Sequence, residues 1–329
     1  MTGGTTVATT VPLLHIEGLH VGFRNGDAVR HVVRGVDLRL EAGEVVGLVG
    51  ESGSGKSITA LSVMRLLPPG ASITSGRISF RGQDMLDLGH AELNRLRGGA
   101  IGMIFQDPLT ALNPAIPVGR QLTDAIRAHQ PLGPRAARDR AKELLALVGI
   151  PFPQERLRAY PHELSGGMRQ RVMIALAVSS NPSLLIADEP TTALDVTVQA
   201  QVMDLIDRIR REFNIAVLFI SHNLELVAEI ADRVTVMYAG RAVESGDVHA
   251  LFASPAHPYT RQLIRCIPRL DGTSGAMATI PGLPPIIGAL PPGCPFAPRC
   301  EAAEPQCSQD EPPMRWRGKH MAACYLAPS

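Results

Sequence analysis

The feature that most constrains the fold of this chain is a glycine-rich segment that joins an apolar run to a helical pattern. Residues 50–57 read Gly-Glu-Ser-Gly-Ser-Gly-Lys-Ser, which fits the Gly-x-x-x-x-Gly-Lys-Ser phosphate-binding loop, or P-loop. The valine-rich run 45–49 predicts a buried strand before it, and the apolar spacing from Ser57 onward predicts a helix after it. This order indicates a nucleoside triphosphate site in an α/β domain.

The residue types of the P-loop explain how it would bind phosphate. Backbone N–H groups from Gly53 to Ser57 are expected to converge on phosphate oxygens, at the partly positive N-terminus of a helix. Lys56 is expected to neutralise the β- and γ-phosphates, and Ser57 to ligate Mg²⁺. The expected nucleotide-binding set is Gly50, Ser52, Gly53, Ser54, Gly55, Lys56, Ser57 and Ile58.

A second apolar run ends abruptly in two carboxylates. Residues 183–190 read SLLIADEP, a pattern typical of a buried parallel strand with acidic groups at its ligand-binding end. Asp188 is expected to hold Mg²⁺ through water, and Glu189 to orient or deprotonate an attacking water. An isolated acidic pair is more often a helix cap or a solvated turn, but here it accompanies a P-loop.

A third segment, residues 164–171, reads LSGGMRQR and opens a predicted helix. The two glycines after Ser165 leave the helix N-terminus bare of side chains, so a phosphate could approach the backbone closely. An ordinary serine N-cap is the alternative interpretation.

Together these segments resemble the ATPase subunits of ATP-binding-cassette (ABC) transporters over about residues 13–250. The resemblance also includes Gln106 in FQDP, Ala193-Leu194-Asp195 and Ser221-His222-Asn223. The segments FQDPLTALNP (105–114) and GCPFAPRC (293–300) are similar to the dipeptide and oligopeptide importers among these. Nickel and glutathione importers share much of the pattern, so the substrate stays open between peptides, nickel and glutathione.

The resemblance implies an α/β fold, a P-loop NTPase cassette with a mainly parallel core sheet and an antiparallel N-terminal β part. It also implies an inserted helical subdomain and an irregular C-terminal extension rich in cysteine and proline. The expected boundaries are a flexible N-terminus at 1–12, a nucleotide-binding domain at 13–250 with the helical subdomain at 107–181, and the extension at 251–329. The apolar spacing predicts helices at 118–129, 134–148, 165–179 and 257–264, and strands at 184–187, 216–220 and 234–238.

The family also assigns roles by motif. Gln106 would contact Mg²⁺ or the lytic water, and His222 would touch the γ-phosphate, so that both join Glu189 in catalysis. Phe23 is the candidate for stacking on adenine, with a core position as the alternative. A second set would act on ATP held by the opposite subunit of a closed dimer: Ser165, Gly166, Gly167 and Asp195.

The C-terminal extension is set apart by its composition. Four of the five cysteines fall in its last 36 residues, with the spacing C-x5-C-x6-C-x16-C, among many prolines. Four thiolates suit zinc or an iron–sulfur cluster; the lack of C-x2-C pairs disfavours zinc, and resemblance to some peptide-importer ATPases favours a [4Fe–4S] cluster. Reduced thiols or disulfides are the other alternative. The expected ligands are Cys294, Cys300, Cys307 and Cys324.

Charge and hydropathy limit the partners. Lysine and arginine total 32 against 31 aspartates and glutamates, which argues against a nucleic-acid partner. Residues 1–12 lack the pattern of a signal peptide, and no apolar run suits a membrane span. The resemblance then implies a peripheral ATP hydrolase on the cytoplasmic face of the membrane. Its partners would be two transmembrane permease subunits, a second ATPase subunit, either a paralogue or itself, and indirectly an extracellular peptide-binding protein. A soluble non-transport ABC ATPase and an exporter subunit are the alternatives.

Overall fold

The computed structural model describes residues 11–26, 28–192, 194–267, 279–286, 288–317 and 320–327. Of the predicted flexible N-terminus, residues 1–10 lie outside the described residues, as does Ala193 of the motif that contains Asp195. In the described part no helix is long and apolar enough to cross a membrane.

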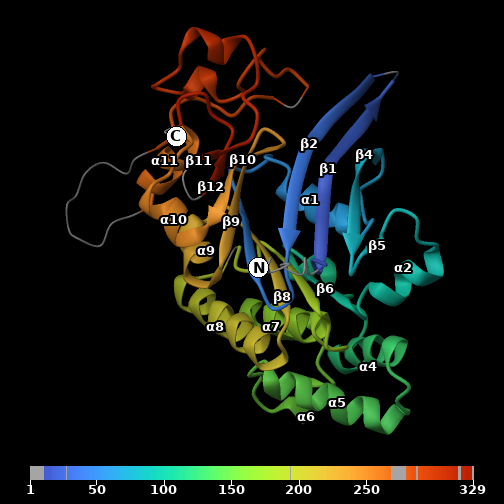
Figure 1. The fold of residues 1–329 in the computed structure, drawn as a ribbon. Coiled ribbons are helices and arrows are strands. Elements are labelled where there is room, and N and C mark those ends of the chain that lie inside the picture. The colour runs from blue at the N-terminus through green and yellow to red at the C-terminus, as the bar shows by residue number, and fades with distance from the viewer. Residues whose placement is uncertain are drawn as a thin grey trace, which may run out of the picture.

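The N-terminal part is an antiparallel sheet (Figure 1). Its strand order is β2-β1-β4-β5, and every neighbouring pair is antiparallel. This confirms the antiparallel N-terminal part. The strands are β1 (Leu14–Asn25), β2 (Ala28–Leu40), β4 (Ala71–Phe80) and β5 (Gln83–Asp84).

The second sheet has the order β11-β12-β10-β9-β3-β8-β7-β6. The five strands β9, β3, β8, β7 and β6 are parallel to one another, whereas the pairs β9–β10, β10–β12 and β12–β11 are antiparallel. The predicted mainly parallel core sheet is therefore confirmed. The strands are β3 (Val45–Val49), β6 (Ile101–Ile104), β7 (Leu184–Asp188), β8 (Ala216–Ser221), β9 (Arg233–Tyr238), β10 (Arg241–Asp247), β11 (Arg315–Arg317) and β12 (His320–Ala322).

Alternate residues of the central strands enter two hydrophobic clusters. Val45 and Val49 belong to one cluster, while Val46 and Leu48 belong to the other. Since successive side chains of a strand point to opposite faces, the core sheet is buried on both sides. This explains why every residue of β3, β6, β7 and β8 is buried.

A layer of helices lies between β6 and β7 in the chain and at one end of the core sheet in space (Figure 1). It contains α3 (Pro108–Ala111), α4 (Val118–His129), α5 (Pro134–Leu147), α6 (Pro153–Arg156), the 3-10 turn η1 (Pro161–Glu163) and α7 (Gly166–Ala177). The remaining helices are α1 (Lys56–Val63), α2 (His90–Leu96), α8 (Val196–Phe213), α9 (Leu224–Ile230), α10 (Val248–Ala253) and α11 (Pro258–Arg265).

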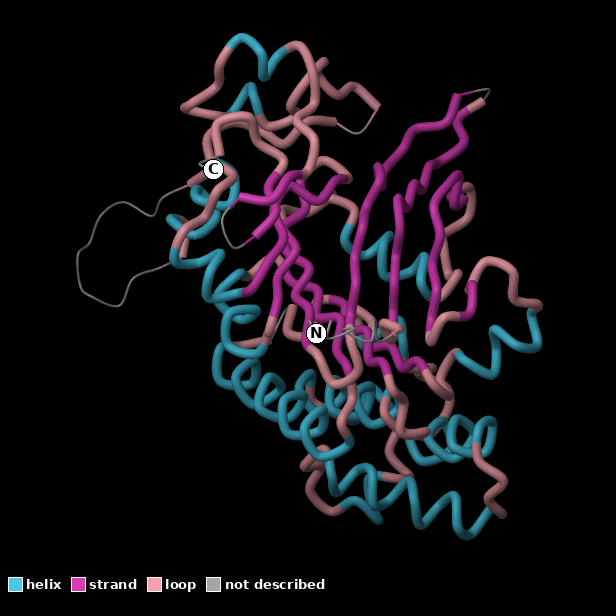
Figure 2. The backbone as a smooth tube through the Cα atoms, viewed as in Figure 1, coloured by secondary structure: helices cyan, strands magenta, loops and turns pink. Residues whose placement is uncertain are grey.

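The C-terminal extension is largely irregular, as predicted (Figure 2). It contains two 3-10 turns, η2 (Ala297–Arg299) and η3 (Pro305–Ser308). The sequence interpretation missed that β11 and β12 extend the core sheet along β10. Each has only three residues, too few for an alternating pattern to be recognised.

Candidate functional site

The predicted site residues follow neighbouring parallel strands. The P-loop follows β3, His222 follows β8, Asp188 ends β7, and Gln106 lies just beyond β6. These strands are adjacent in the order β3-β8-β7-β6, so their carboxyl ends share one edge of the sheet. That edge is where open α/β sheets bind ligands.

The P-loop needs its glycines for close backbone approach. A Cβ on Gly50 would lie 2.1 Å from the carbonyl oxygen of Met237, a distance that no side chain tolerates. Gly55 has φ 99°, in the left-handed region, and α1 begins at the next residue. The loop conformation therefore requires glycine at positions 50 and 55.

Lys56 and Ser57 begin α1, directly after the glycines of the P-loop. The Nζ of Lys56 donates to the carbonyl oxygens of Gly50 and Glu51 at 2.8 and 3.0 Å. Burial lowers the pKa of Lys56, and the carboxylates of Glu189, Asp188 and Glu51 oppose that shift. A buried ammonium held at the loop is suited to receive phosphate charge.

The magnesium ligands predicted from two distant motifs face each other. The Ser57 hydroxyl donates to Oδ1 of Asp188 at 3.0 Å. Burial, the largest cause, raises the pKa of Asp188 to about 6, while the hydrogen bond from Ser57 opposes it. Hydroxyl and carboxylate oxygens are ligands that Mg²⁺ prefers, and a cation would offset the cost of burying this carboxylate. The donor set therefore fits Mg²⁺.

Glu189 is the centre of a small polar cluster. Its Oε2 accepts hydrogen bonds from Nε2 of Gln106 at 3.1 Å and from the hydroxyl of Thr192 at 2.9 Å, and Nδ1 of His222 lies 3.4 Å from it. The backbone of Glu189 has φ 47°, which is strained for this residue type, and its N–H is held by the carbonyl of Ile220 at 2.9 Å.

The fold thus brings Gln106, Glu189 and His222 together. The sequence interpretation missed Thr192, which reaches Glu189 through a tight turn in which its N–H donates to the Glu189 carbonyl at 3.1 Å. Two hydrogen bonds and the contact with His222 therefore converge on one carboxylate oxygen of Glu189.

The N-terminus of α7 is open to another molecule. Ser165 is the N-cap, and its hydroxyl accepts from the N–H of Met168 at 3.3 Å. Both Ser165 and Gly166 are exposed, and a Cβ on Gly166 would meet nothing within 4 Å. Packing within this chain therefore does not require a glycine at position 166.

Two further predicted residues serve local structural roles in this chain. Asp195 is exposed and caps α8 by accepting from the N–H of Val198 at 2.9 Å. Phe23 is half-buried in β1 and packs against the second hydrophobic cluster. The ring of Phe23 therefore has both a core contact and an open face.

One small cavity is lined by Cys294, Cys300, Cys307 and Cys324, together with residues that include Phe296 and Leu326. All four are free thiols, as is Cys266, so the disulfide interpretation is not met. Burial raises the pKa of Cys294 to about 11 and also raises the pKa values of Cys300 and Cys324. Among the described residues no group of three or more His, Cys, Asp or Glu is placed to hold a metal ion.

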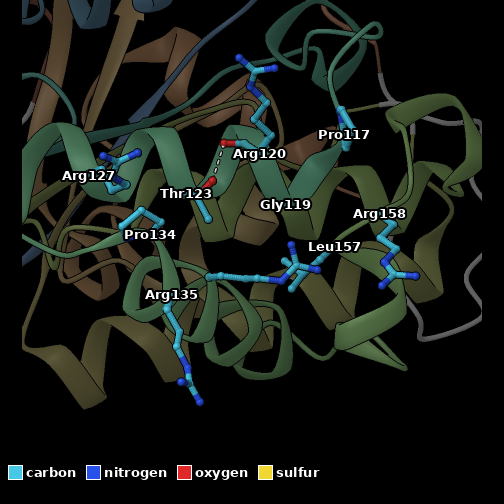
Figure 3. A pocket seen from close by; sticks show the side chains of 10 residues that line it. Pro117, Gly119, Arg120, Thr123, Arg127, Pro134, Arg135, Leu157 and Arg158 are labelled. Atoms are coloured by element: carbon cyan, nitrogen blue, oxygen red, sulfur yellow. Dashed lines mark hydrogen bonds between the residues drawn. The ribbon is translucent and has the colours of Figure 1, made fainter.

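The helical layer carries a groove of about 600 Å³ with a strongly basic rim (Figure 3). Its arginines come from α4, from α5 and from the segment after α6, and the labelled guanidinium groups point outward in different directions (Figure 3). Sequence reasoning missed this groove because its members are spread over three elements. They are Arg120, Arg127, Arg135, Arg138 and Arg158.

Two family models match the chain. Residues 33–192 match the model described as ABC transporter. Residues 243–307 match the model described as oligopeptide/dipeptide transporter, C-terminal region. The second match includes three of the four cavity cysteines.

The relatives cover most of the chain. It is 47% identical over 316 residues to the dipeptide transport ATP-binding protein DppD of Bacillus subtilis, covering 95% of this chain and 94% of that protein. It is 52% identical over 317 residues to the oligopeptide transport ATP-binding protein OppD of Mycobacterium tuberculosis, covering 95% of this chain and 52% of that longer protein.

A solved structure shares the cassette. It is the dimeric post-hydrolysis state of an ATP-binding cassette bound to ADP and Pi, with a TM-score of 0.65 and 25% identity. The match covers 71% of this chain and 98% of the solved one.

Proposed function

The chain belongs to the ABC transporter ATP-binding family, and from that premise we propose that it hydrolyses ATP to power import of di- or oligopeptides through separate membrane subunits. The observation that carries the ATPase role is the Glu189 carboxylate, fixed on one oxygen beside the P-loop lysine and the Ser57–Asp188 pair. The peptide substrate is supported by the match of the extension to the oligopeptide/dipeptide transporter region. Nickel and glutathione are the other substrates to test.

The mechanism follows from which atoms are held. Because the contacts of Gln106, Thr192 and His222 all fall on Oε2 of Glu189, Oε1 is the oxygen that would accept the proton of the attacking water. Glu189 accepts a proton as the water oxygen bonds to the γ-phosphorus and the bond to the β-phosphate oxygen breaks, leaving ADP and phosphate. Ser57 and Asp188 would hold Mg²⁺, which neutralises phosphate charge when bound.

A second ATPase subunit would complete the site. Its supporting observation is the open N-terminus of α7, where Ser165 and Gly166 face solvent and could meet the γ-phosphate of ATP on a partner. Gly167 and the exposed Asp195 would lie in the same interface. The partner is a paralogue or a second copy of this chain.

We also propose that Cys294, Cys300, Cys307 and Cys324 hold a [4Fe–4S] cluster with a structural role. The support is that the four thiols line one cavity in a largely irregular part of the chain. A single zinc ion needs four sulfurs at about 2.3 Å from one centre, whereas a cluster accepts one thiolate at each of four separate irons. We expect protein purified without oxygen to contain iron and sulfide. The Cys300→Ser variant should lose both, and the control Cys266→Ser should keep both. Protein without iron would contradict the proposal.

The arginine-rimmed groove is the proposed docking place of a permease segment that carries carboxylates. Five arginines on one rim favour an acidic partner, and such steering weakens with salt. Arg127→Glu with Arg135→Glu should reduce recovery of the permease subunits, while Arg211→Glu on the exposed face of α8 should not. Equal recovery in both variants would place the contact elsewhere.

The test of the whole assignment is the set of chains that copurify from detergent-solubilised membranes. We expect two hydrophobic permease chains and an ATPase partner. Recovery of this protein on ribosomes or DNA instead would indicate a non-transport ATPase. Recovery with a permease fused to its own ATPase would indicate an exporter.

A further inference from the structure

The C-terminal extension reaches the nucleotide site through one arginine. The guanidinium of Arg299, at the end of η2, contacts both carboxylate oxygens of Glu51: Nη1 lies 2.7 Å from Oε2, and Nη2 lies 2.9 Å from Oε1. Glu51 is the second residue of the P-loop. A two-pronged contact of this kind fixes direction as well as distance.

This ion pair lies inside the protein. The side chain of Arg299 is 5% exposed and that of Glu51 is 25% exposed. Arg299 also donates from Nη1 to the Tyr238 hydroxyl at 3.2 Å and from Nε to the Pro281 carbonyl at 2.9 Å. An arginine held from three sides can impose a position on Glu51, because it has little freedom to follow movements of the loop.

The backbone of Glu51 is held by the extension as well. Its N–H donates to the hydroxyl of Tyr259, in α11, at 2.9 Å. Tyr259 packs against Tyr238 and Phe296, with ring centroids 4.6 and 5.3 Å away. The carbonyl of the same residue, Glu51, accepts from Lys56. One P-loop residue therefore joins the extension to the lysine that would bind phosphate.

We propose that Arg299 is a positioning residue for the P-loop, so that docking of the C-terminal extension sets the affinity of this chain for ATP. The proposal rests on the nucleotide role of the P-loop and goes beyond it, because Arg299 itself would touch no phosphate. Arg299 acts by holding the Glu51 peptide in the orientation that leaves the following N–H groups directed at the nucleotide.

The same turn connects ATP binding to the four-cysteine cavity. Arg299 directly precedes Cys300, and η2 lies between Cys294 and Cys300. The N–H of Arg299 donates to the Phe296 carbonyl at 2.9 Å, and Phe296 lines the cavity. Loss of order around these thiols therefore displaces the arginine from Glu51.

The experiment compares ATP binding and ATP turnover in the full-length protein carrying Arg299→Met. The dissociation constant for MgATP should rise about tenfold, and KM should rise with it, while kcat per folded molecule should change less than about twofold. Partial unfolding alone would lower the active fraction and leave KM unchanged. Arg299→Lys keeps the charge but loses the two-pronged contact, so it should restore only part of the affinity.

A double-mutant cycle tests whether Arg299 acts through Glu51. Glu51→Gln should weaken ATP binding. The dissociation constant of the double variant for MgATP should lie within about twofold of that of the single variant that binds more weakly. The matched control is Arg315→Met, an exposed arginine in β11 of the same extension, which should leave ATP binding unchanged.

Three results would overturn the proposal: wild-type affinity in Arg299→Met, additive effects in the cycle, or an equal loss in Arg315→Met. A wild-type protein that fails to bind MgATP would instead contradict the proposed ATPase role. Cys300→Ala should weaken ATP binding in the same direction as Arg299→Met and should not add to it. Unchanged affinity in Cys300→Ala would show that the cavity does not act through Arg299.

Discussion

The nucleotide edge of the core sheet and the C-terminal extension are held in place by different forces. At the edge, parallel strands with every residue buried deliver Asp188, Glu189 and His222 to adjacent positions. In the extension, short turns depend on individual polar contacts, such as Glu311 with Arg34 and Arg241 and Glu51 with Arg299.

Substitutions are therefore expected to act differently in the two regions. Because strand pairing holds the backbone of the sheet edge, the loss of one side chain there should leave its geometry unchanged and alter the chemistry alone. The extension has few strand pairs, so the loss of a side chain there should first weaken its docking on the core domain. The ion pair of Arg299 and Glu51 connects the two regions. Through this pair, a substitution that weakens docking of the extension is expected to affect the nucleotide site.

The largest expected effect separates chemistry from binding at the sheet edge. Glu189→Gln should lower ATP hydrolysis by about 10² to 10⁴, or roughly 3 to 6 kcal/mol in the barrier, because the amide cannot accept the proton. ATP binding and thermal stability should remain. Phosphate release under steady state measures the rate, and Glu225→Gln, an exposed position in the first turn of α9, is the control. Near-parental turnover would mean that Glu189 is not the base.

The second prediction concerns docking of the extension. Glu244 is fully buried and accepts from the N–H groups of Ala256 and His257 at 2.7 and 2.9 Å. Glu244→Ala leaves these two buried N–H groups unpaired, also removes the 2.9 Å contact of Glu244 with Nε2 of the buried His320, and should lower the free energy of unfolding by about 3 kcal/mol. Glu244→Gln keeps an acceptor and should lose less. Urea denaturation measures both, and equal stability of all three proteins would show that these bonds do not hold the extension.

A third substitution separates helix capping from ligand binding at α7. Ser165→Asp should preserve the cap, since both side chains accept the same bond, and stability should change by less than about 0.5 kcal/mol. A carboxylate facing the γ-phosphate of the partner's ATP should nevertheless lower hydrolysis at least about tenfold. If hydrolysis is unchanged while stability is also unchanged, Ser165 is only a cap.

The smallest effect is a pH dependence confined to the extension. Burial lowers the pKa of His257 to about 3 from an ordinary value of 6.5. The unfolded chain therefore binds the proton first, and stability should decline as pH falls below 6.5, by about 1 kcal/mol over the first pH unit. His257→Asn keeps an acceptor for the Tyr259 N–H but cannot titrate, so it should flatten this part of the stability profile. An unchanged profile in that variant would assign the loss to other groups.

Sequence could predict the nucleotide edge because its residues stand at the ends of apolar strands. Parallel topology brings such ends together, so the pairs Ser57–Asp188 and Gln106–Glu189 follow from motifs that lie far apart in the chain. Thr192 was not predictable from a pattern, because its contact depends on the tight turn after Glu189.

In the extension, the sequence predicts the helix at 257–264, observed as α11 (Pro258–Arg265), and a cluster of four cysteines, but not the contacts that position the irregular turns. The pair of Arg299 and Glu51 joins positions 248 residues apart, and no periodicity connects a 3-10 turn to a P-loop. The strands β11 and β12 were also missed, because they gain their order from the edge of β10. Phe23 stayed ambiguous because a half-buried ring in a strand suits both a core and a ligand contact.

The proposed function can be tested by ATP-driven peptide uptake into vesicles that contain the purified transport complex. We expect uptake that requires ATP, disappears with Glu189→Gln, and in Arg299→Met is recovered by raising the ATP concentration. Uptake that proceeds equally well in the Glu189→Gln complex would contradict it.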